Sequence, residues 1–462
     1  MFEVFGSMFQ FAVLKLTRTP RCAGHTAPRS LQAASGAKFV LRSERLRYHV
    51  ASLALRAALD TDYEGCLSES SVVETCNEAP LLLRVLRCDP SVPRPPVWFM
   101  RQAGRYMSAF RMYSGRYAFR ERAETPEIAV ELSLQPWRAF GVDAVIMFAD
   151  ILTPLPPMGL DYQIISGQGP SIKTPVRCME DVERVRPLTP EDAETALSFV
   201  GTTLSTLAHT LADARPRPAL LGFLGAPFTL AAYGIEGEGG RASSGKQVKR
   251  MMYTAEGREL MHRLLQKITQ SMIVFAAYQA RKGAEAIQIF DSWAHLLSPE
   301  DYQEFSLFYV EQLVRGIRAH GVETPLIFFA NGSCGKLGVI SAMYPADTRE
   351  ANGYRGLDAL ALDWRTSIAE ARQLFGKRAV LQGNIDPTVL ACGDAASVKA
   401  AIDRCVCAAS GGAHILNVGH GIQPDTPEEM VALFCEHVRA LPETDWYQQL
   451  RHRHLVENGV PG

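Results

Sequence analysis

Two arginines, Arg101 and Arg105, flank Gly104 in the segment RQAGRY at 101–106, directly after the apolar run 97–100. An arginine stays charged at any working pH, and its planar guanidinium matches carboxylates and phosphates through paired hydrogen bonds. Two guanidiniums directed at one place therefore fit a ligand with several negative charges. A pair of solvated surface arginines is the alternative, and the motif by itself leaves both open.

Further polar residues end or follow the apolar runs elsewhere in the chain. In chain order they are Asp150, Tyr233, Asp291 with Ser292, Asn331, Asn384 with Asp386, and His420. Asp150 is an acid placed to meet a bound ligand, and its alternative role is to cap the helix that follows it. His420 stands between Gly419 and Gly421, and paired glycines let a backbone approach a ligand closely, although a histidine at such a place is more often structural.

The chain lacks the usual signatures of cofactor chemistry. No phosphate cradle of the GK[ST] type follows an apolar run, and no lysine stands where a Schiff base would need one. These residues predict a cofactor-free reaction on a polycarboxylate.

The apolar runs that precede these residues predict the fold. There are eight, at 97–100, 144–149, 219–224, 286–290, 325–329, 359–363, 379–382 and 414–418. Such runs are typical of strands buried on both faces, and segments with helical spacing separate most of them. This alternation predicts an α/β fold, a single-domain (β/α)8 TIM barrel, with an open doubly wound sheet as the alternative. In a barrel, the residues named above would converge at the carboxyl-terminal face of the sheet.

Composition restricts the class of protein. The chain has 462 residues, and its 48 basic and 49 acidic side chains give a net charge of −1, so nothing global indicates a nucleic-acid partner. The ten cysteines are scattered without a CxxC pair, which is typical of reduced thiols in an intracellular protein. No apolar stretch is long enough for a membrane span, so we expect no stable membrane insertion.

The N-terminal region differs from the rest. Residues 1–59 carry nine basic side chains and two acidic ones, a profile typical of an organelle transit peptide, and residues 60–79 are acidic. We expect a targeting leader and disordered linker over 1–93, the barrel over 94–445 and a C-terminal tail over 446–462. The expected location is a plastid, with the mitochondrion or the cytoplasm as alternatives. A disordered tail or a mispredicted start codon is the other explanation of this region.

Six stretches together carry a family resemblance. They are MRQAGRYM (100–107), FADILTPLPPMG (148–159), GFLGAPFTL (222–230), IQIFDSWAH (287–295), LQGNIDP (381–387) and NVGHGI (417–422). In this order they resemble the uroporphyrinogen decarboxylase family of porphyrin (haem and chlorophyll) biosynthesis, TIM-barrel homodimers that remove four acetate carboxylates from uroporphyrinogen III to give coproporphyrinogen III. The resemblance implies a tetrapyrrole substrate, no cofactor and no metal.

The resemblance also implies roles for particular residues. Asp150 would stabilise positive charge on the substrate ring, and Arg101 and Arg105 would hold carboxylates, either of them delivering a proton. The other residues implied in the site are Gln102, Ala103 and Gly104 of the hexapeptide, Tyr233 and Ser292 to position the reacting arm, His420 for another carboxylate, and Phe290 and Phe110 as apolar walls.

Two features depart from the family pattern. Many members carry a further arginine where this chain has Ser114, with Arg111 and Arg116 as neighbours, so it is open whether Arg116 replaces that arginine. The stretch 345–355 resembles an insertion, for which we expect a surface loop.

The alternative function is a zinc-dependent corrinoid or thiol methyltransferase of the related barrel superfamily. The histidine ligand of those enzymes is missing two residues before Cys334.

Overall fold

The computed structural model describes residues 79–165, 169–237, 244–344 and 356–457. The chain divides into two compact units, Met1–Cys76 and Asn77–Gly462. The leader expected over the first residues, and the loop expected at 345–355, lie outside the described residues. No helix in the described ranges is long and apolar enough to cross a membrane.

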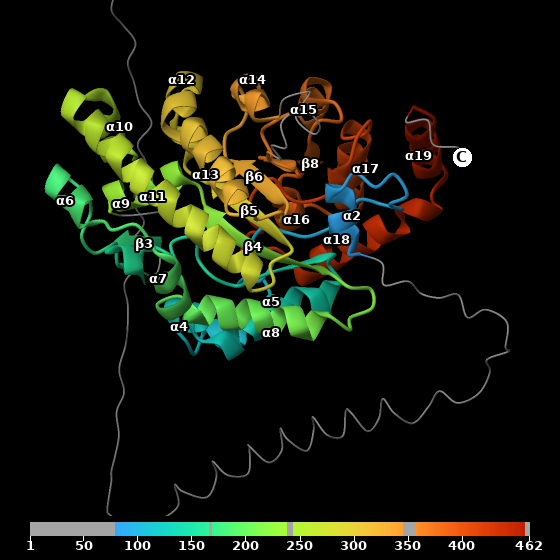
Figure 1. Cartoon of the computed structure of the whole chain (residues 1–462). Coiled ribbons are helices and arrows are strands. Elements are labelled where there is room, and N and C mark those ends of the chain that lie inside the picture. The colour runs from blue at the N-terminus through green and yellow to red at the C-terminus, as the bar shows by residue number, and fades with distance from the viewer. Residues whose placement is uncertain (1–78, 166–168, 238–243, 345–355, 458–462) are drawn as a thin grey trace, which may run out of the picture. The chain divides into compact units, whose positions relative to one another are not determined.

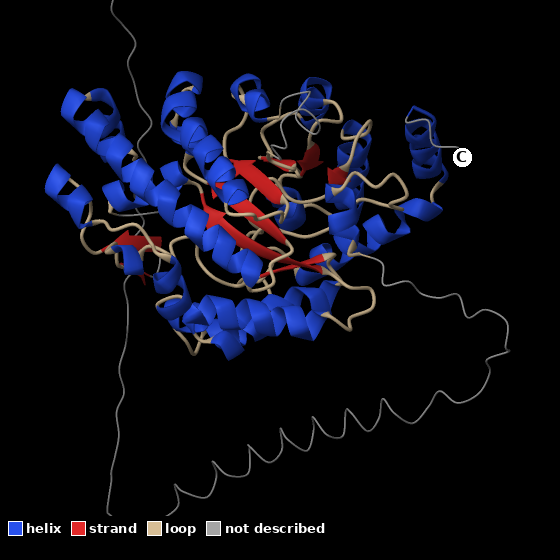
Figure 2. Cartoon of the chain, in the orientation of Figure 1, coloured by secondary structure: helices blue, strands red, loops and turns tan. Residues whose placement is uncertain are grey.

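A curled sheet of parallel strands forms the centre of the second unit, and helices surround it (Figures 1 and 2). In order across the sheet the strands are β1 (Ala144–Ile146), β4 (Ala219–Gly225), β5 (Ala286–Asp291), β6 (Leu326–Ala330), β7 (Ala359–Leu362), β8 (Val380–Gln382) and β9 (His414–Ile415). Each run predicted as a strand from the second to the eighth overlaps one of these strands. The burial of these runs on both faces explains why their continuous apolar character identified them.

The first predicted run closes the barrel. Val97 makes a parallel bridge with Leu416, whose N–H donates to the Pro96 carbonyl at 2.9 Å. On the other side, the N–H of Asp143 donates to the Val97 carbonyl at 2.7 Å. This extended segment therefore joins β9 to β1, and the predicted (β/α)8 barrel is confirmed in preference to the open sheet.

Helices cover the outside of the barrel. They are α5 (Pro126–Phe140), α8 (Ser198–Leu211), α11 (Ala255–Arg281), α13 (Phe308–Ala319), α15 (Ile368–Phe375), α17 (Ala395–Ala408) and α18 (Glu428–Ala440). Further helices occupy the connections: α3 (Ser108–Ser114), α4 (Phe119–Glu124), α6 (Met179–Arg184), α7 (Pro190–Thr195), α9 (Pro227–Glu236), α10 (Lys246–Tyr253), α12 (Pro299–Tyr302), α14 (Leu337–Ile340) and α16 (Pro387–Cys392). Local sequence signals set the ends of these helices. For example, α5 begins with Pro126, and its last residue is followed by Gly141, whose φ of 63° suits a left-handed cap.

A short helix, α2 (Leu81–Leu86), packs at the amino-terminal end of the barrel. Its side chains Leu82, Leu83, Val85 and Leu86 are buried in one cluster with residues of the barrel interior. Strands β1, β4, β5 and β7 all begin with alanine there, and these small side chains leave room for the leucines. Folded structure therefore begins before residue 94, where the sequence placed the start of the barrel.

Two further elements were not predicted. Strands β2 (Tyr162–Ile165) and β3 (Gly169–Ile172) form an antiparallel pair, and the Ile172 N–H donates to the Gly237 carbonyl at the end of α9 at 2.6 Å. Helix α19 (Asp445–Glu457) lies in the expected C-terminal tail, and its Tyr447 is buried in the core. The strands β2 and β3 are short, and α19 lacks the periodic apolar pattern that identifies a helix.

The packing of α2 predicts how the chain responds to truncation. A chain that begins at Asn77 should unfold at the same temperature as the full chain, whereas one that begins at Arg94 should be destabilised by several kcal/mol, because a buried leucine contributes roughly 1.5–3 kcal/mol. For a milder test, Leu82→Ala should cost about 2–5 kcal/mol in chemical denaturation, and Arg87→Ala, at the exposed end of α2, should be near neutral. Equal stability of the two truncated chains would contradict a structural role for α2.

Candidate active site

One buried side chain fixes the hexapeptide 101–106, which follows the extended segment at Val97. Gln102 is fully buried; its Oε1 accepts from the Phe99 N–H at 3.2 Å and its Nε2 donates to the Ala144 carbonyl at 3.1 Å. The Tyr106 hydroxyl donates to the Gln102 carbonyl at 2.8 Å. Gln102 therefore ties the segment to β1, and its amide is occupied within the protein.

Arg101 and Arg105 are exposed on either side of this anchor. Neither forms an ion pair with a carboxylate of the described residues, whereas other arginines such as Arg120, Arg138 and Arg217 do. Arg101 has a φ of 60°, a left-handed conformation that is uncommon outside glycine, and such strain often occurs at functional sites. Two unpaired cations thus lie next to the carboxyl-terminal end of the barrel.

Gly419 and Gly421, on either side of His420, have no side chain, and other parts of the protein occupy the space that a side chain would fill. A Cβ on Gly421 would lie 2.3 Å from Cδ of Arg101, and one on Gly419 would lie 2.1 Å from the backbone nitrogen of Trp364. The sequence argument gave this space to a ligand, whereas the structure fills it with the Arg101 side chain and with the chain after β7. The glycines consequently bring Arg101 and His420 together.

Asp150 follows β1 and is partly buried. Its Oδ1 accepts from the Leu152 N–H at 2.9 Å, so one oxygen caps the turn that follows. This agrees in part with the alternative role of Asp150 as a cap. No hydrogen bond from the described residues engages the other oxygen. Burial raises the pKa of Asp150, while the Leu152 N–H and the nearby Arg101 partly oppose that rise.

Tyr233 lies on α9, close enough to Asp150 and Arg101 for both charges to act on it. Burial raises the pKa of its hydroxyl, so Tyr233 is a neutral hydrogen-bond donor at neutral pH. Its ring meets that of Trp293 edge to face, with centroids 5.1 Å apart. The neighbouring acid Asp291 is fully buried, accepts hydrogen bonds from Thr229 and Ser306, and has a pKa raised to about 6 by burial. Asp291 therefore has a structural role, because its carboxyl group fixes the hydroxyls of Thr229 and Ser306.

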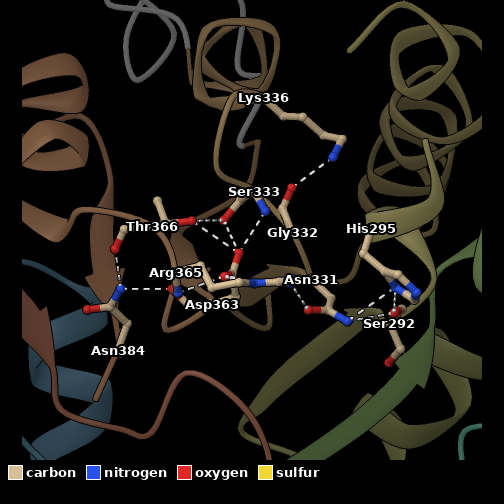
Figure 3. A network of polar contacts seen from close by, with 10 residues as sticks. All are labelled: Ser292, His295, Asn331, Gly332, Ser333, Lys336, Asp363, Arg365, Thr366 and Asn384. Carbon is tan, nitrogen blue, oxygen red and sulfur yellow. Dashed lines mark hydrogen bonds and ion pairs between the residues drawn. The ribbon is translucent and has the colours of Figure 1, made fainter. Parts of the chain in front are cut away.

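A polar network links the ends of β5 to β8 (Figure 3). The Ser292 carbonyl accepts from Nδ2 of Asn331 at 3.0 Å, and Oδ1 of Asn331 accepts from Nη2 of Arg365 at 3.0 Å. His420 lies near Arg365 and Arg101, and burial together with these two cations lowers its pKa to about 4. Its imidazole is therefore neutral at neutral pH and offers one N–H.

The remaining predicted residues differ in exposure. Phe290 is partly buried and meets Phe223 and Phe329 edge to face, with centroids 5.9 and 6.1 Å apart. Phe110 is only 4% exposed and packs against Phe148, so its ring belongs to the core. Ala103 and Gly104 are partly exposed between the two arginines.

Sequence reasoning missed Arg122, on α4. The residue is 7% exposed, and its guanidinium carbon lies over the rings of Phe110, Phe119 and Phe148, 5.1, 5.4 and 5.8 Å from their centroids. Nη1 has no hydrogen-bond partner in the described part of the chain, and burial, followed by the charge of Arg105, lowers the pKa of Arg122. The charges of Arg122 and Arg105 therefore act on each other, although the two residues lie in different segments of the chain.

The neighbours of Ser114 have separate positions. Ser114 ends α3, and Arg116 after it is exposed. Arg111 donates from Nη1 to the carbonyls of Arg105 and Tyr106 at 3.0 and 2.6 Å, so it supports the backbone of the hexapeptide. Arg111 is therefore a support of Arg105, while Arg116 lies in solvent.

The amino-terminal end of the barrel has a cavity that is a second candidate for the active site. A cavity of about 440 Å³ lies between the end of α2, the start of β9 and α19. The carboxyl-terminal end is the stronger candidate, because Asp150, Tyr233 and His420 have perturbed pKa values there beside unpaired arginines. Among the described residues, no group of three or more His, Cys, Asp or Glu side chains is placed to hold a metal ion.

Comparisons with known proteins identify the family. A family model described as uroporphyrinogen decarboxylase (URO-D) matches residues 77–441, which begins where the second compact unit begins. The chain is 44% identical over 361 residues to the uroporphyrinogen decarboxylase of Crocosphaera subtropica, covering 78% of this chain and 95% of that protein. It is 43% identical over 371 residues to "Uroporphyrinogen decarboxylase 2, chloroplastic" of Oryza sativa subsp. japonica, covering 80% of this chain and 89% of that protein.

A solved structure supports the fold separately. A methyltransferase from Methanosarcina mazei superposes with a TM-score of 0.63, covering 78% of this chain and 97% of that one, at 19% sequence identity. A likeness at this identity shows the barrel fold and carries no argument about the reaction.

Proposed function

The chain belongs to the uroporphyrinogen decarboxylase family, whose members are carboxy-lyases, and on that premise we propose that its site converts uroporphyrinogen III to coproporphyrinogen III. Four acetate carboxylates leave as CO2 in that reaction, which belongs to porphyrin biosynthesis. The observation that carries the proposal is the unpaired pair Arg101 and Arg105 at the carboxyl-terminal end of the barrel, where the charge of Arg101 acts on Asp150.

Substrate binding follows from the charges. Uroporphyrinogen carries eight carboxylates, and the exposed guanidiniums of Arg101 and Arg105 offer forked, charge-assisted hydrogen bonds to them. Tyr233, the Ser292 hydroxyl and the neutral His420 offer further hydrogen-bond donors, and Phe290 offers an apolar surface to the macrocycle. Gln102 acts by holding the hexapeptide, because its own amide is occupied.

The chemical step uses the substrate as its own electron sink. A proton added to a pyrrole carbon adjacent to nitrogen creates a cation, and the C–C bond to the carboxylate then breaks, with its electron pair flowing into the ring as CO2 leaves. Protonation of the resulting exocyclic carbon gives the methyl group, and loss of the proton from the ring carbon restores the pyrrole. The protons balance, and no external electron acceptor is needed.

Asp150 fits the task of stabilising that cation. Its free oxygen can accept hydrogen bonds from the pyrrole N–H groups, and these donors favour the ionised form that burial disfavours. The charge of Arg101 also favours the ionised form of Asp150, although burial still raises the pKa of the carboxyl group. Arg101 and Arg105 are the candidates to deliver the proton.

Location and assembly form part of the same proposal. The plastid assignment rests on the acid-poor first 59 residues and on the chloroplastic name of the rice relative. The homodimer rests on the family resemblance and stays a prediction, which sedimentation of the purified chain would decide.

Replacing Asp150 tests the electrostatic role. Asp150→Asn keeps the cap to Leu152 but removes the negative charge, so kcat should fall by roughly 10² to 10³. Asp386→Asn is a matched control, because Asp386 also follows a strand and caps a turn two residues on, accepting from Thr388 at 2.8 Å. Near-normal turnover in the Asp150 variant, measured by chromatography of the carboxylated products, would remove Asp150 from the mechanism.

Lysine substitutions test the arginine pair. Arg101→Lys and Arg105→Lys keep the charge but lose the planar two-point geometry, so each should lower kcat/KM by an amount equivalent to about 1.5–3 kcal/mol. The exposed Arg116→Lys is the control and should change little. Equal, small effects at all three positions would mean that diffuse surface charge attracts the substrate.

The leader is tested by a fusion. Residues 1–76, joined to a fluorescent protein and expressed in plastid-bearing cells, should direct the signal into the plastid, because an Arg-rich, acid-poor segment is read as an import signal. A signal confined to the cytosol or to mitochondria would overturn the plastid assignment.

A further inference from the structure

Arg365 follows β7 at the carboxyl-terminal end of the barrel, where hydrogen bonds fix its side chain (Figure 3). Its Nε donates to Oδ1 of Asp363 at 3.2 Å, and its Nη2 donates to Oδ1 of Asn331 at 3.0 Å. The side chain is nevertheless 44% exposed. One edge of the guanidinium is therefore held by the protein, and no hydrogen bond from the described residues engages Nη1.

The anchor beneath Arg365 does not depend on it. Asp363 is fully buried and also accepts from the Ser333 N–H at 2.7 Å, the Ser333 hydroxyl at 3.0 Å and the Thr366 hydroxyl at 3.1 Å. Despite burial, the donors from Arg365 and Ser333 lower the pKa of Asp363. A change at Arg365 would therefore leave this carboxylate with donors in place.

Asn331 connects Arg365 to the candidate active site. Its Oδ1 accepts from Arg365, while its Nδ2 donates to the carbonyl of Ser292 at 3.0 Å. The amide thus fixes the guanidinium relative to the segment that carries Ser292. This is the geometry of a positioning residue.

Arg365 also lies near His420. The close approach of Gly419 to the Trp364 backbone places the chain before Arg365 directly against the strand end that carries His420. Both Arg365 and Arg101 act electrostatically on His420. His420 consequently lies within reach of two guanidiniums that come from opposite parts of the sequence.

We propose that Arg365 is a further binding residue for a substrate carboxylate in this site, and that Asn331 positions it. The inference rests on the proposed function, in which a ring carries carboxylate arms on every side. Arg101 and Arg105 meet one part of that ring, and Arg365 offers Nη1 to an arm on another. Because Asp363 offsets part of its charge, Arg365 binds through directed hydrogen bonds rather than through net charge.

Such an arm does not react while Arg365 holds it, so the interaction is present in the ground state and in the transition state. Arg365→Gln should then raise the KM for uroporphyrinogen roughly tenfold, with kcat lowered less than threefold. Arg138→Gln is the matched control, since Arg138 is an exposed arginine paired with Glu131 on the outer helix α5. An unchanged KM together with a lowered melting temperature would overturn the proposal and make Arg365 a structural residue.

Asn331→Ala tests the positioning role. Alone it should raise KM by a smaller factor than Arg365→Gln, and in the Arg365→Gln background it should add nothing, because the side chain it positions is gone. Full additivity of the two changes would overturn the role assigned to Asn331. Arg365→Lys should resemble Arg365→Gln, because an ammonium cannot bond Asp363 and Asn331 and still reach the substrate.

Failure of this inference can be distinguished from failure of the proposed function. If Asp150→Asn loses turnover while Arg365→Gln keeps its KM, only the inference about Arg365 is wrong. If the unaltered chain does not decarboxylate uroporphyrinogen, the proposed function is wrong, and Arg365 is then tested on equilibrium binding of uroporphyrin, the oxidised octacarboxylate, followed by its fluorescence. Equal affinity of the unaltered chain and Arg365→Gln for that probe would overturn the inference.

Discussion

The closure of the barrel at Val97 is the constraint on which the site depends. The carboxylate of Asp143 accepts from the Val97 N–H at 2.7 Å and from both terminal nitrogens of Arg94 at 2.7 and 2.9 Å. These bonds hold the first strand segment between β1 and β9, with its other edge on Leu416. Because the hexapeptide follows at once, closure brings Arg101 next to Gly421. A barrel left open at this seam would separate the arginines from His420, although each local element could still form.

The sequence predicted the barrel well because its signal is physical and repeated. Each strand is covered on both faces, so its residues are apolar whatever the neighbouring loops do. Helix α2 gave no comparable signal, since six residues after an acidic segment are too few for a periodic pattern. Its role becomes visible only when the alanines that begin the strands are seen to leave space for it.

Within the site, residue types were easier to predict than their partners. Arg101, Arg105, Asp150, Tyr233 and His420 are at the expected end of the sheet, because that follows from strand order. The contact of Gln102 with Ala144 and those of the two glycines at 419 and 421 could not be predicted, since they join segments more than 40 residues apart. Arg122 shows the same limit: nothing in its spacing separates it from Arg120, which is paired with Glu124 at 2.6 Å, yet its three-dimensional surroundings are entirely different.

Three acids near the strand ends show how hydrogen-bond donors decide the use of a carboxylate. Asp363 receives donors on both oxygens from Arg365, Ser333 and Thr366, which makes its charge permanent and its role structural. Asp291 receives two hydroxyls in a fully buried place, and its pKa rises to about 6.

Asp150 has one backbone donor on one oxygen and an arginine nearby, so its second oxygen still lacks a donor from the described chain. A buried carboxylate in that condition is unfavourable by itself and becomes favourable when a ligand supplies N–H groups. Of the three, Asp150 is therefore the acid with an oxygen left for a donor from a ligand, and in the proposed function the pyrrole N–H groups of the substrate supply that donor.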